Sequence, residues 1–316
     1  MRFVIHGSSL LKPTSPAGAL GRALLGLNST SASRHAWQVV TGRVDHAEAV
    51  IRHVQDTTQS RSELAAVAMS LAPSHVDQVA ENMKRLGSTG LLLLPDAIDT
   101  AQWDATQTLL NAAKAAKLQH LVLVSTAASA SDSLVPSGKS WFELESAAEA
   151  TNIPVTIVHP ATFMDSFLYG NLLDMVCGRT LSVTMETARI AFVDGRDVAD
   201  VVNQLLSDEK PTASKTLHLT GPAALSWQDV AATFSRHLCS PVHYSKFPLW
   251  AVQTSMWVQG KRPEEIHELV NLSRYYEAQY ESETSSTIHD LLGRPPRSFD
   301  QFVRDHAESW PLRKFT

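Results

Sequence analysis

The sequence predicts an α/β fold built around a doubly wound parallel sheet. Short apolar segments alternate with helical patterns through the first half of the chain, and no internal repeat interrupts this alternation. Strands that alternate with helices form β–α–β units, whose right-handed crossovers make the strands parallel. Apolar residues make up 44% of the 316 residues and charged residues 19%, which is enough for a sizeable core.

The expected elements of the first half follow one another in regular order. Strands are expected at 3–5, 37–41, 64–69, 91–95 and 121–125, and helices at 19–27, 47–54, 75–86 and 101–116. Ser74 is the expected N-cap of the third helix. The small, polar segment 126–139 is expected to form a long loop, before a helix at 142–150 and a strand at 155–158. Ligands of such folds bind at the carboxyl ends of the strands.

The pattern becomes irregular after Thr162. Helices are expected at 198–206, 227–237, 249–258, 263–277 and 299–310, and a strand at 216–219. We therefore expect a sheet domain over residues 1–160. Residues 161–316 would form mainly a smaller C-terminal α/β lobe that binds the substrate, with one or more segments returning to the sheet.

Composition and charge exclude several classes of protein. The formal net charge of −5 argues against binding to nucleic acid through phosphates. Two cysteines provide neither a disulfide scaffold nor a cysteine-rich zinc site, and no His-Glu-x-x-His pattern indicates another metal site. No apolar run approaches the ~20 residues of a membrane helix, and residues 1–7 are too short for a signal peptide. We expect a cytoplasmic protein with a small-molecule substrate and neither a nucleic-acid nor a membrane partner; a homodimer is compatible with the sequence.

Glycines between the first strand and its helix are typical of a loop that cradles phosphates. Gly7 follows the strand, while Gly18 and Gly21 open the helix. Glycine lets the backbone approach a pyrophosphate at the helix N-terminus. The spacing of Gly18 and Gly21 fits the last two glycines of such a loop, but the segment after Gly7 is roughly eight residues longer than expected.

Seven segments, in order along the chain, resemble the NmrA-like family, a branch of atypical short-chain dehydrogenases common in fungi. They are Gly18–Leu25, Val40–Arg43, Leu121–Thr126, Glu145 with Asn152–Ile157, Pro160–Asp165, Phe192–Val198 and Pro296–Phe302. The resemblance implies a Rossmann domain, a small substrate lobe and a pocket between them. It also places Arg43 where many members hold the 2′-phosphate of NADP.

The chain departs from this family at positions that transfer protons. No Tyr-x-x-x-Lys follows the fifth strand, and Trp141 stands where members often carry Lys or His, one helical turn before Glu145. His159 replaces the usual Arg before a proline, and Ser166 replaces a frequent Asn. A tryptophan cannot transfer a proton at neutral pH, so these departures indicate altered chemistry.

Asp165 is the first candidate for a general acid, with His159 or Lys139 as base or partner. His159 and Asp165 flank the segment 160–163, just after the predicted strand 155–158, and the apolar residues Phe163 and Met164 lie beside Asp165 in the sequence. A carboxyl group in an apolar pocket can have a raised pKa and donate a proton near neutrality. The alternatives are that Asp165 caps a helix that begins near residue 166, and that His159 is a core histidine.

Further residues are candidates for binding the substrate. Ser125 and Thr126, at the end of the fifth strand, would orient a substrate oxygen. Aromatic and apolar side chains would stack on or enclose a flat substrate; they are Trp141, Phe142, Phe163, Met164 and Tyr169. The alternatives are backbone hydrogen bonds for the hydroxyls and core packing for the rings. A helix with Trp250, Met256 and Trp257 would either pack in the core or close over the pocket.

These observations favour a secondary-metabolism enzyme that requires no cofactor. It would cyclise an aromatic polyketide- or terpenoid-like molecule, by adding a hydroxyl to an alkene or enone, or isomerise it. The alternative is an NADP(H)-dependent reductase (oxidoreductase) that binds its cofactor through Gly7, Gly18, Gly21 and Arg43. A second alternative is a nucleotide-sensing regulator.

Overall fold

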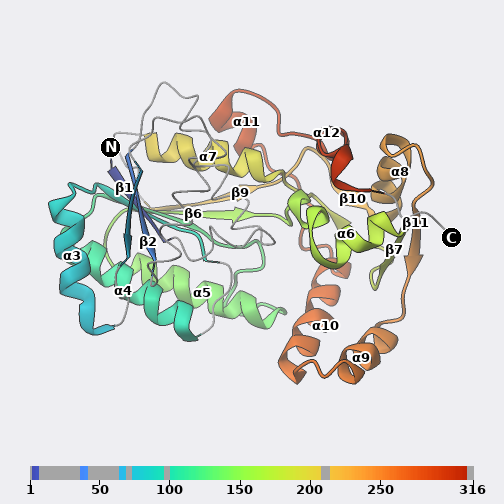
Figure 1. The fold of residues 1–316 in the computed structure, drawn as a ribbon, viewed down its shortest axis with the longest axis horizontal. Coiled ribbons are helices and arrows are strands. Elements are labelled where there is room, and N and C mark those ends of the chain that lie inside the picture. Colours follow the sequence, from blue (N-terminus) through green and yellow to red (C-terminus); the bar gives the residue numbers. More distant parts are fainter. Residues whose placement is uncertain are drawn as a thin grey trace. The chain divides into compact units, whose positions relative to one another are not determined.

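The computed structural model describes residues 2–6, 36–41, 64–68, 73–95, 100–207 and 214–311 (Figure 1). The chain divides into two compact units. Unit 1 contains Met1–Thr126, Ser140–His159 and Val198–Leu217, and unit 2 contains Ala127–Lys139, Pro160–Asp197 and His218–Thr316. Each unit has a hydrophobic core of its own.

Unit 1 is built on a parallel sheet. Its described strands are β1 (Arg2–His6), β2 (Ala36–Thr41), β3 (Leu64–Ala68), β4 (Gly90–Leu93), β5 (His120–Val124), β6 (Val155–Pro160) and β9 (Lys215–Leu219). They lie in the order β3-β2-β1-β4-β5-β6-β9, and the pairs from β3 to β6 are parallel. The order reverses at β1, which is the topological switch point of a doubly wound sheet. The predicted fold class is confirmed.

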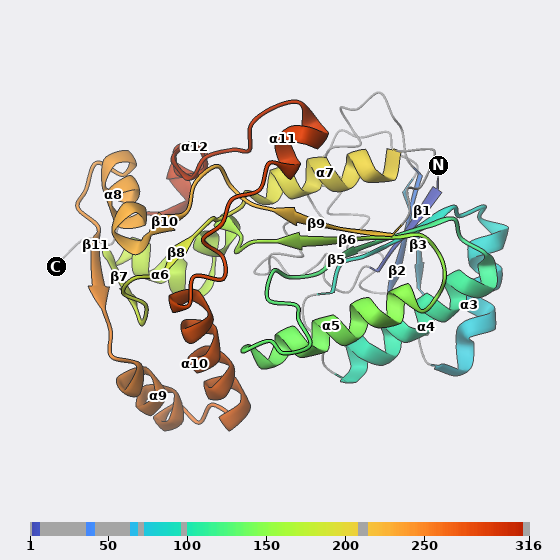
Figure 2. The ribbon, with the colours of Figure 1, turned by 180° about the vertical axis from the view of Figure 1, so that it is seen from behind.

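Helices cover both faces of this sheet. They are α3 (Val76–Arg85), α4 (Thr100–Ala116), α5 (Pro136–Glu149) and α7 (Gly195–Ser207). Figures 1 and 2 show α4 and α5 on one face and α7 on the other. Every residue of β4, β5 and β6 is buried, because helices cover both faces of this parallel sheet.

Two expectations for the helices of this half are wrong. Ser74 does not cap α3, because the chain enters this helix through a 3-10 turn (η1, Pro73–His75) and the Ser74 Oγ lies 3.3 Å from His75 Nδ1. Helix α5 begins at Pro136, inside the expected loop 126–139, since proline suits the first helical turn. The helices expected at 19–27 and 47–54 lie outside the described residues.

Unit 2 combines short helices with two small sheets. Its helices are η2 (Met164–Leu168), α6 (Gly170–Cys177), α8 (Trp227–His237), α9 (Leu249–Val258), α10 (Pro263–Glu277), α11 (Thr287–Leu292), α12 (Phe299–Asp305) and η3 (Ala307–Ser309). Strand β7 (Thr180–Val183) pairs in parallel with β11 (His243–Lys246), and β8 (Arg189–Ile190) pairs antiparallel with β10 (Leu225–Ser226). The expected helix 299–310 ends earlier, at Asp305, and continues as η3.

An aromatic cluster forms the core of unit 2. The ring of Phe167 lies 5.3–5.7 Å from the rings of Phe192, Phe234 and Phe299. The Trp310 indole Nε1–H donates a hydrogen bond of 2.7 Å to the Phe167 carbonyl. These contacts bring η2, α8 and the C-terminal segment together although they lie far apart in sequence.

No helix within the described residues is long and apolar enough to cross a membrane.

Candidate active site

Three buried polar side chains meet at the carboxyl ends of β5 and β6 in unit 1. Ser125 directly follows β5, His159 lies near the end of β6, and Glu145 is on α5. The Ser125 hydroxyl donates a hydrogen bond to Glu145 Oε1, and His159 Nε2 lies 2.8 Å from the same oxygen. Each of the three residues is only 7% exposed. We call this group the Ser-Glu-His cluster.

The sheet and α5 hold this cluster in place. The Ser125 amide donates to the Val158 carbonyl at 2.8 Å, which extends the β5–β6 pairing beyond β5 and sets Ser125 beside His159. On α5, Glu145 belongs to a buried stripe with Trp141, Leu144 and Ala148. A buried carboxylate is stable only with hydrogen-bond donors, and here two donors share one of its oxygens.

This arrangement can transfer a proton. The Glu145 carboxylate connects an imidazole with a hydroxyl, so that a proton can pass between His159 and Ser125 through Glu145. Ser125 stands at the carboxyl edge of the sheet, where doubly wound folds bind their ligands. Within the described residues, no group of three His, Cys, Asp or Glu side chains could hold a metal ion.

The other predicted site residues of unit 1 have different surroundings. Thr126, the next residue after Ser125, is partly exposed. Trp141 is buried in the unit 1 core, whereas the neighbouring Phe142 ring is exposed on the outer side of α5. Of the predicted aromatic side chains on α5, Phe142 therefore offers the accessible ring.

In unit 2, Asp165 reaches the start of α7. Its Oδ2 accepts a hydrogen bond of 2.9 Å from the Gly195 amide, and burial raises the pKa of this carboxyl above its ordinary value of 3.8. The alternative that Asp165 caps the helix beginning near residue 166 is wrong, because the carboxylate turns to α7 instead. Its role as a general acid stays a prediction.

The remaining predicted residues of unit 2 are dispersed. Lys139 is exposed near the start of α5, and its catalytic role also stays a prediction. Met164 is buried in the aromatic core, while Phe163 and Tyr169 are partly exposed on either side of η2.

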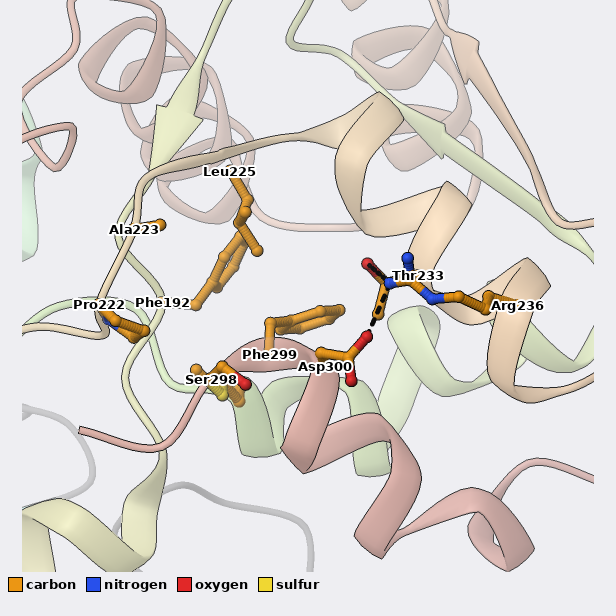
Figure 3. Close-up of a pocket in the computed structure, with 10 residues that line it drawn as sticks. Phe192, Pro222, Ala223, Leu225, Thr233, Arg236, Ser298, Phe299 and Asp300 are labelled. Carbon is orange, nitrogen blue, oxygen red and sulfur yellow. Dashed lines mark hydrogen bonds and ion pairs between the residues drawn. The ribbon is translucent and has the colours of Figure 1, made fainter. Parts of the chain in front are cut away.

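Met164 also forms part of a small cavity of about 230 Å³ in unit 2 (Figure 3). Figure 3 shows Phe192, Leu225 and Phe299 on one side and a hydrogen-bonded group of Thr233, Arg236 and Asp300 on the other. The cavity is predominantly apolar, with one ion pair at its polar side.

The predicted cofactor residues Gly7, Gly18, Gly21 and Arg43 lie outside the described residues. The described strands that precede two of them nevertheless fit a dinucleotide. Gly7 directly follows β1, Arg43 comes two residues after β2, and these strands are parallel neighbours at the switch point of the sheet. In this topology a dinucleotide crosses the carboxyl ends of the strands there.

Glu145 is the site residue that the sequence analysis did not propose. In the sequence it is noted only as part of the resemblance to the family. The sequence does contain a pattern that indicates its importance. Apolar residues recur at helical spacing at Trp141, Leu144 and Ala148, and Glu145 is the one charged residue on the same side of the helix. A charged residue on the buried side of a helix indicates a partner within the protein.

The fold and the switch-point geometry define a Rossmann-type α/β protein. The model of the NmrA-like family matches residues 97–303, and the chain belongs to this family. The resemblance seen in the sequence is confirmed.

Two reductases are similar to this chain in sequence. An NAD(P)H azoreductase of Xenophilus azovorans is 27% identical over 81% of this chain and 89% of its own length. A (4-alkanoyl-5-oxo-2,5-dihydrofuran-3-yl)methyl phosphate reductase of Streptomyces griseus is 28% identical over 63% of this chain and 70% of its own.

Solved structures show the same fold. The triphenylmethane reductase of Citrobacter sp., in complex with NADP(H), has a TM-score of 0.73 at 18% identity and covers 96% of this chain and 99% of its own. An NADPH-dependent quinone oxidoreductase of Escherichia coli, in complex with NADPH, has a TM-score of 0.74 at 14% identity, with coverages of 98% and 100%.

These names correct the favoured functional hypothesis. The chain is an enzyme, but the expectation of a cyclase or isomerase is wrong, because the matched relatives are reductases. The expectation that no cofactor is required is also wrong, because the azoreductase relative is named for its use of NAD(P)H. The altered proton-transfer positions led to that hypothesis, but hydride transfer does not require a Tyr and Lys pair as its proton source.

Proposed function

We propose that the protein is an NAD(P)H-dependent reductase of a small conjugated organic molecule. The observation that carries this proposal is the strand order, which reverses at β1 directly before Gly7. The names of the relatives support the same activity.

The sequence provides residues for two parts of the cofactor, the pyrophosphate and the 2′-phosphate of NADP. Gly7, Gly18 and Gly21 would let the backbone approach the pyrophosphate, and Arg43 would pair with the 2′-phosphate of NADP. A reduced nicotinamide, when bound, supplies a hydride. The longer segment between Gly7 and Gly18 would have to be accommodated beside the pyrophosphate.

The Ser-Glu-His cluster would supply the proton that accompanies the hydride. The Ser125 hydroxyl would turn from Glu145 to the reduced acceptor and release its proton to it. Its oxygen would then take a proton back through Glu145 from His159, which would be reprotonated from water. The acceptor gains two electrons and two hydrogens in total, one as hydride and one as proton. Ser125 is suited to this step because it is the cluster member at the carboxyl edge of the sheet.

The acceptor would be a flat molecule with an electron-poor double bond, such as an azo compound, a quinone or an enone. The names of the relatives support this class. The exposed Phe142 ring and the Thr126 hydroxyl would contact it. A secondary metabolite of this type remains the expected natural substrate.

The test is nicotinamide oxidation by the purified full chain. NADPH or NADH is mixed with an azo dye, a quinone and an enone, and consumption of the reduced nicotinamide is compared with formation of the reduced acceptor. We expect equal amounts of both with at least one acceptor. Calorimetry that detects no binding of either nucleotide would contradict the proposal. Binding without turnover of any acceptor would also contradict it and would favour a nucleotide-sensing regulator.

A pair of variants tests the role of the cluster. Glu145→Gln keeps the size of the side chain but cannot relay a proton as a carboxylate does, and we expect kcat to fall about 100-fold with nucleotide affinity unchanged. Glu143→Gln changes an exposed residue of the same helix and should leave kcat within about twofold. Equal kcat values for both variants would remove Glu145 from the mechanism without affecting the proposed reaction.

A further inference from the structure

Helix α9 of unit 2 has two apolar faces and no charged residue. Leu249, Val252 and Met256, spaced three and four residues apart, are partly buried, and α9 contacts α10. Figures 1 and 2 both show α9 beside α10. One apolar face therefore accounts for the packing of α9 within unit 2.

The other face consists of large side chains in solvent. Trp250, Trp257 and Val258 are 70%, 73% and 72% exposed, and Thr254 lies among them. Trp250 and Trp257 are seven residues apart, which is two helical turns, so they share one side of the helix. We call Trp250, Thr254, Trp257 and Val258 the outer face of α9.

We propose that the outer face of α9 joins two copies of this chain, with the two α9 helices antiparallel about a twofold axis near Thr254. A twofold contact uses the same surface on both copies. Thr254 lies midway between the tryptophans, so an antiparallel arrangement places Trp250 of each copy on Trp257 of the other. Because the outer face has no charge, two copies meet without repulsion or desolvation of ions.

The area of this surface is sufficient for a dimer. The two tryptophans and Val258 offer on the order of 500 Å² of apolar surface per copy. Two copies would then bury about 1,000 Å², the lower limit for a specific interface. Tryptophans near the centre of an interface contribute strongly to its affinity.

Sedimentation of the full chain over a range of concentrations tests this proposal. We expect a mass of about twice 34.6 kDa at high concentration. The double variant Trp250→Glu/Trp257→Glu should raise the dissociation constant of the dimer about 100-fold or more. Leu134→Glu changes another exposed apolar residue of unit 2 and should leave the dimer intact. Circular dichroism and thermal midpoints check that all variants fold, which is expected because the replaced side chains point into solvent.

Cross-linking tests the antiparallel geometry. In a Cys239→Ser background, which removes the exposed cysteine, Thr254→Cys should form a disulfide between copies on mild oxidation. Ser255→Cys changes the next exposed residue, which lies off the outer face, and should cross-link at least tenfold more slowly.

Three outcomes would overturn the proposal. They are a chain that stays monomeric at every concentration, a dimer that the double tryptophan variant does not weaken, and cross-linking at residue 255 that equals cross-linking at 254. A monomer that binds neutral lipid vesicles through its tryptophans would assign the outer face of α9 to a membrane surface instead.

Discussion

His159 is the residue of the Ser-Glu-His cluster at which this chain departs from the usual sequence of the family. The resemblance implies an arginine at this position, which would be a permanently charged partner for Glu145. Histidine can accept and release a proton at physiological pH, whereas arginine cannot. In the proposed mechanism, the histidine therefore gives Glu145 a partner that can pass on a proton, and Glu145 also accepts a hydrogen bond from the Ser125 hydroxyl.

Replacing His159 by glutamine tests this difference. Glutamine retains an N–H donor for Glu145 but cannot carry a proton, so we expect kcat to fall by at least tenfold while the KM for nicotinamide stays within twofold. Steady-state kinetics provide the measurement, and His267→Gln, an exposed histidine of α10, is the control. A rise in KM with kcat unchanged would show that His159 only shapes the binding site.

Asp165 leads to a prediction about stability and pH. Burial raises its pKa in the folded protein above the 3.8 expected in the unfolded chain. Between these two values the folded state binds more protons, so the contribution of Asp165 to stability is greatest below pH 3.8 and decreases as the pH rises through the folded pKa. An asparagine at this position would not titrate. The unfolding free energy of Asp165→Asn relative to wild type should therefore increase with pH across this window and then level off.

Urea unfolding at several pH values from below 3.8 to neutrality measures this difference. The asparagine can still accept a hydrogen bond from the Gly195 amide, so the fold should persist. A relative stability that decreases with pH would mean that the Gly195 hydrogen bond outweighs burial. The same variant also tests whether Asp165 is the general acid. A loss of about 100-fold in kcat would support that role, whereas the Ser-Glu-His cluster predicts activity within about threefold of wild type.

At the scale of elements, a buried carboxylate fastens the start of α7 to the segment before α12. Asp197 is fully buried and accepts hydrogen bonds from the backbone amide of Arg297 at 2.6 Å and from its guanidinium. Arg294 adds an ion pair of 2.8 Å. One carboxylate thus joins two segments of unit 2 that are about a hundred residues apart in sequence.

Neutralising this carboxylate should destabilise unit 2. Asp197→Asn leaves two arginines without their charged partner and keeps an amide at a fully buried position, so we expect a loss of about 3 kcal/mol in the free energy of unfolding. Denaturant titration measures it, with Asp132→Asn at an exposed site as the control, expected within about 0.5 kcal/mol of wild type. A loss below about 1 kcal/mol would show that the backbone amide of Arg297 dominates this contact.

Local signals explain which elements the sequence predicted well. The bounds of α8, α9 and α10 agree with the expected helices because their starts are marked: Ser226 and Asp229 form a capping box before α8, Pro248 precedes α9, and Pro263 opens α10. The start of α5 was missed because Ser and Gly residues around Pro136 look like a loop. The partner of Asp165 was missed for another reason, since no local pattern links a residue at 165 to an amide at 195.

The candidate site could likewise be predicted only where local signals mark its residues. Ser125 and His159 could be predicted because strand ends are visible as ends of apolar runs. Their connection through Glu145 could not, since it depends on how α5 packs against β5 and β6. The expected non-redox reaction is wrong because it takes the absence of a Tyr and Lys pair as a loss of redox chemistry, whereas the named relatives are reductases.

At the scale of the whole molecule, the Ser-Glu-His cluster belongs entirely to unit 1. Thr126 and His159 are the last residues of the first two segments of unit 1, and Val198–Leu217 is its third segment. The carboxyl ends of β4 and β5, and β6 as far as His159, are part of unit 1. A ligand that binds there only when unit 1 is folded would therefore stabilise unit 1.

Hydrogen exchange with and without NADPH should reveal this effect. At a free concentration of about 100 times Kd, a nucleotide that binds only folded unit 1 stabilises it by about 2.7 kcal/mol, so amides that exchange by unfolding of this unit should slow about 100-fold. We expect this in β4, β5 and β6, while amides of α8 and α12, which belong to the separate core of unit 2, slow less than threefold. Equal protection in both cores would show that the two units unfold together.

Arg43→Gln provides the matched control for this experiment. Glutamine removes the proposed partner of the 2′-phosphate, so NADPH should lose at least tenfold in affinity and protect β4, β5 and β6 correspondingly less at the same concentration. NADH lacks this phosphate and should protect the variant and the wild type equally. If both nucleotides lost the same affinity, Arg43 would contribute to the fold of unit 1 rather than to the choice between NADPH and NADH, and the strand order would remain as the support for the cofactor.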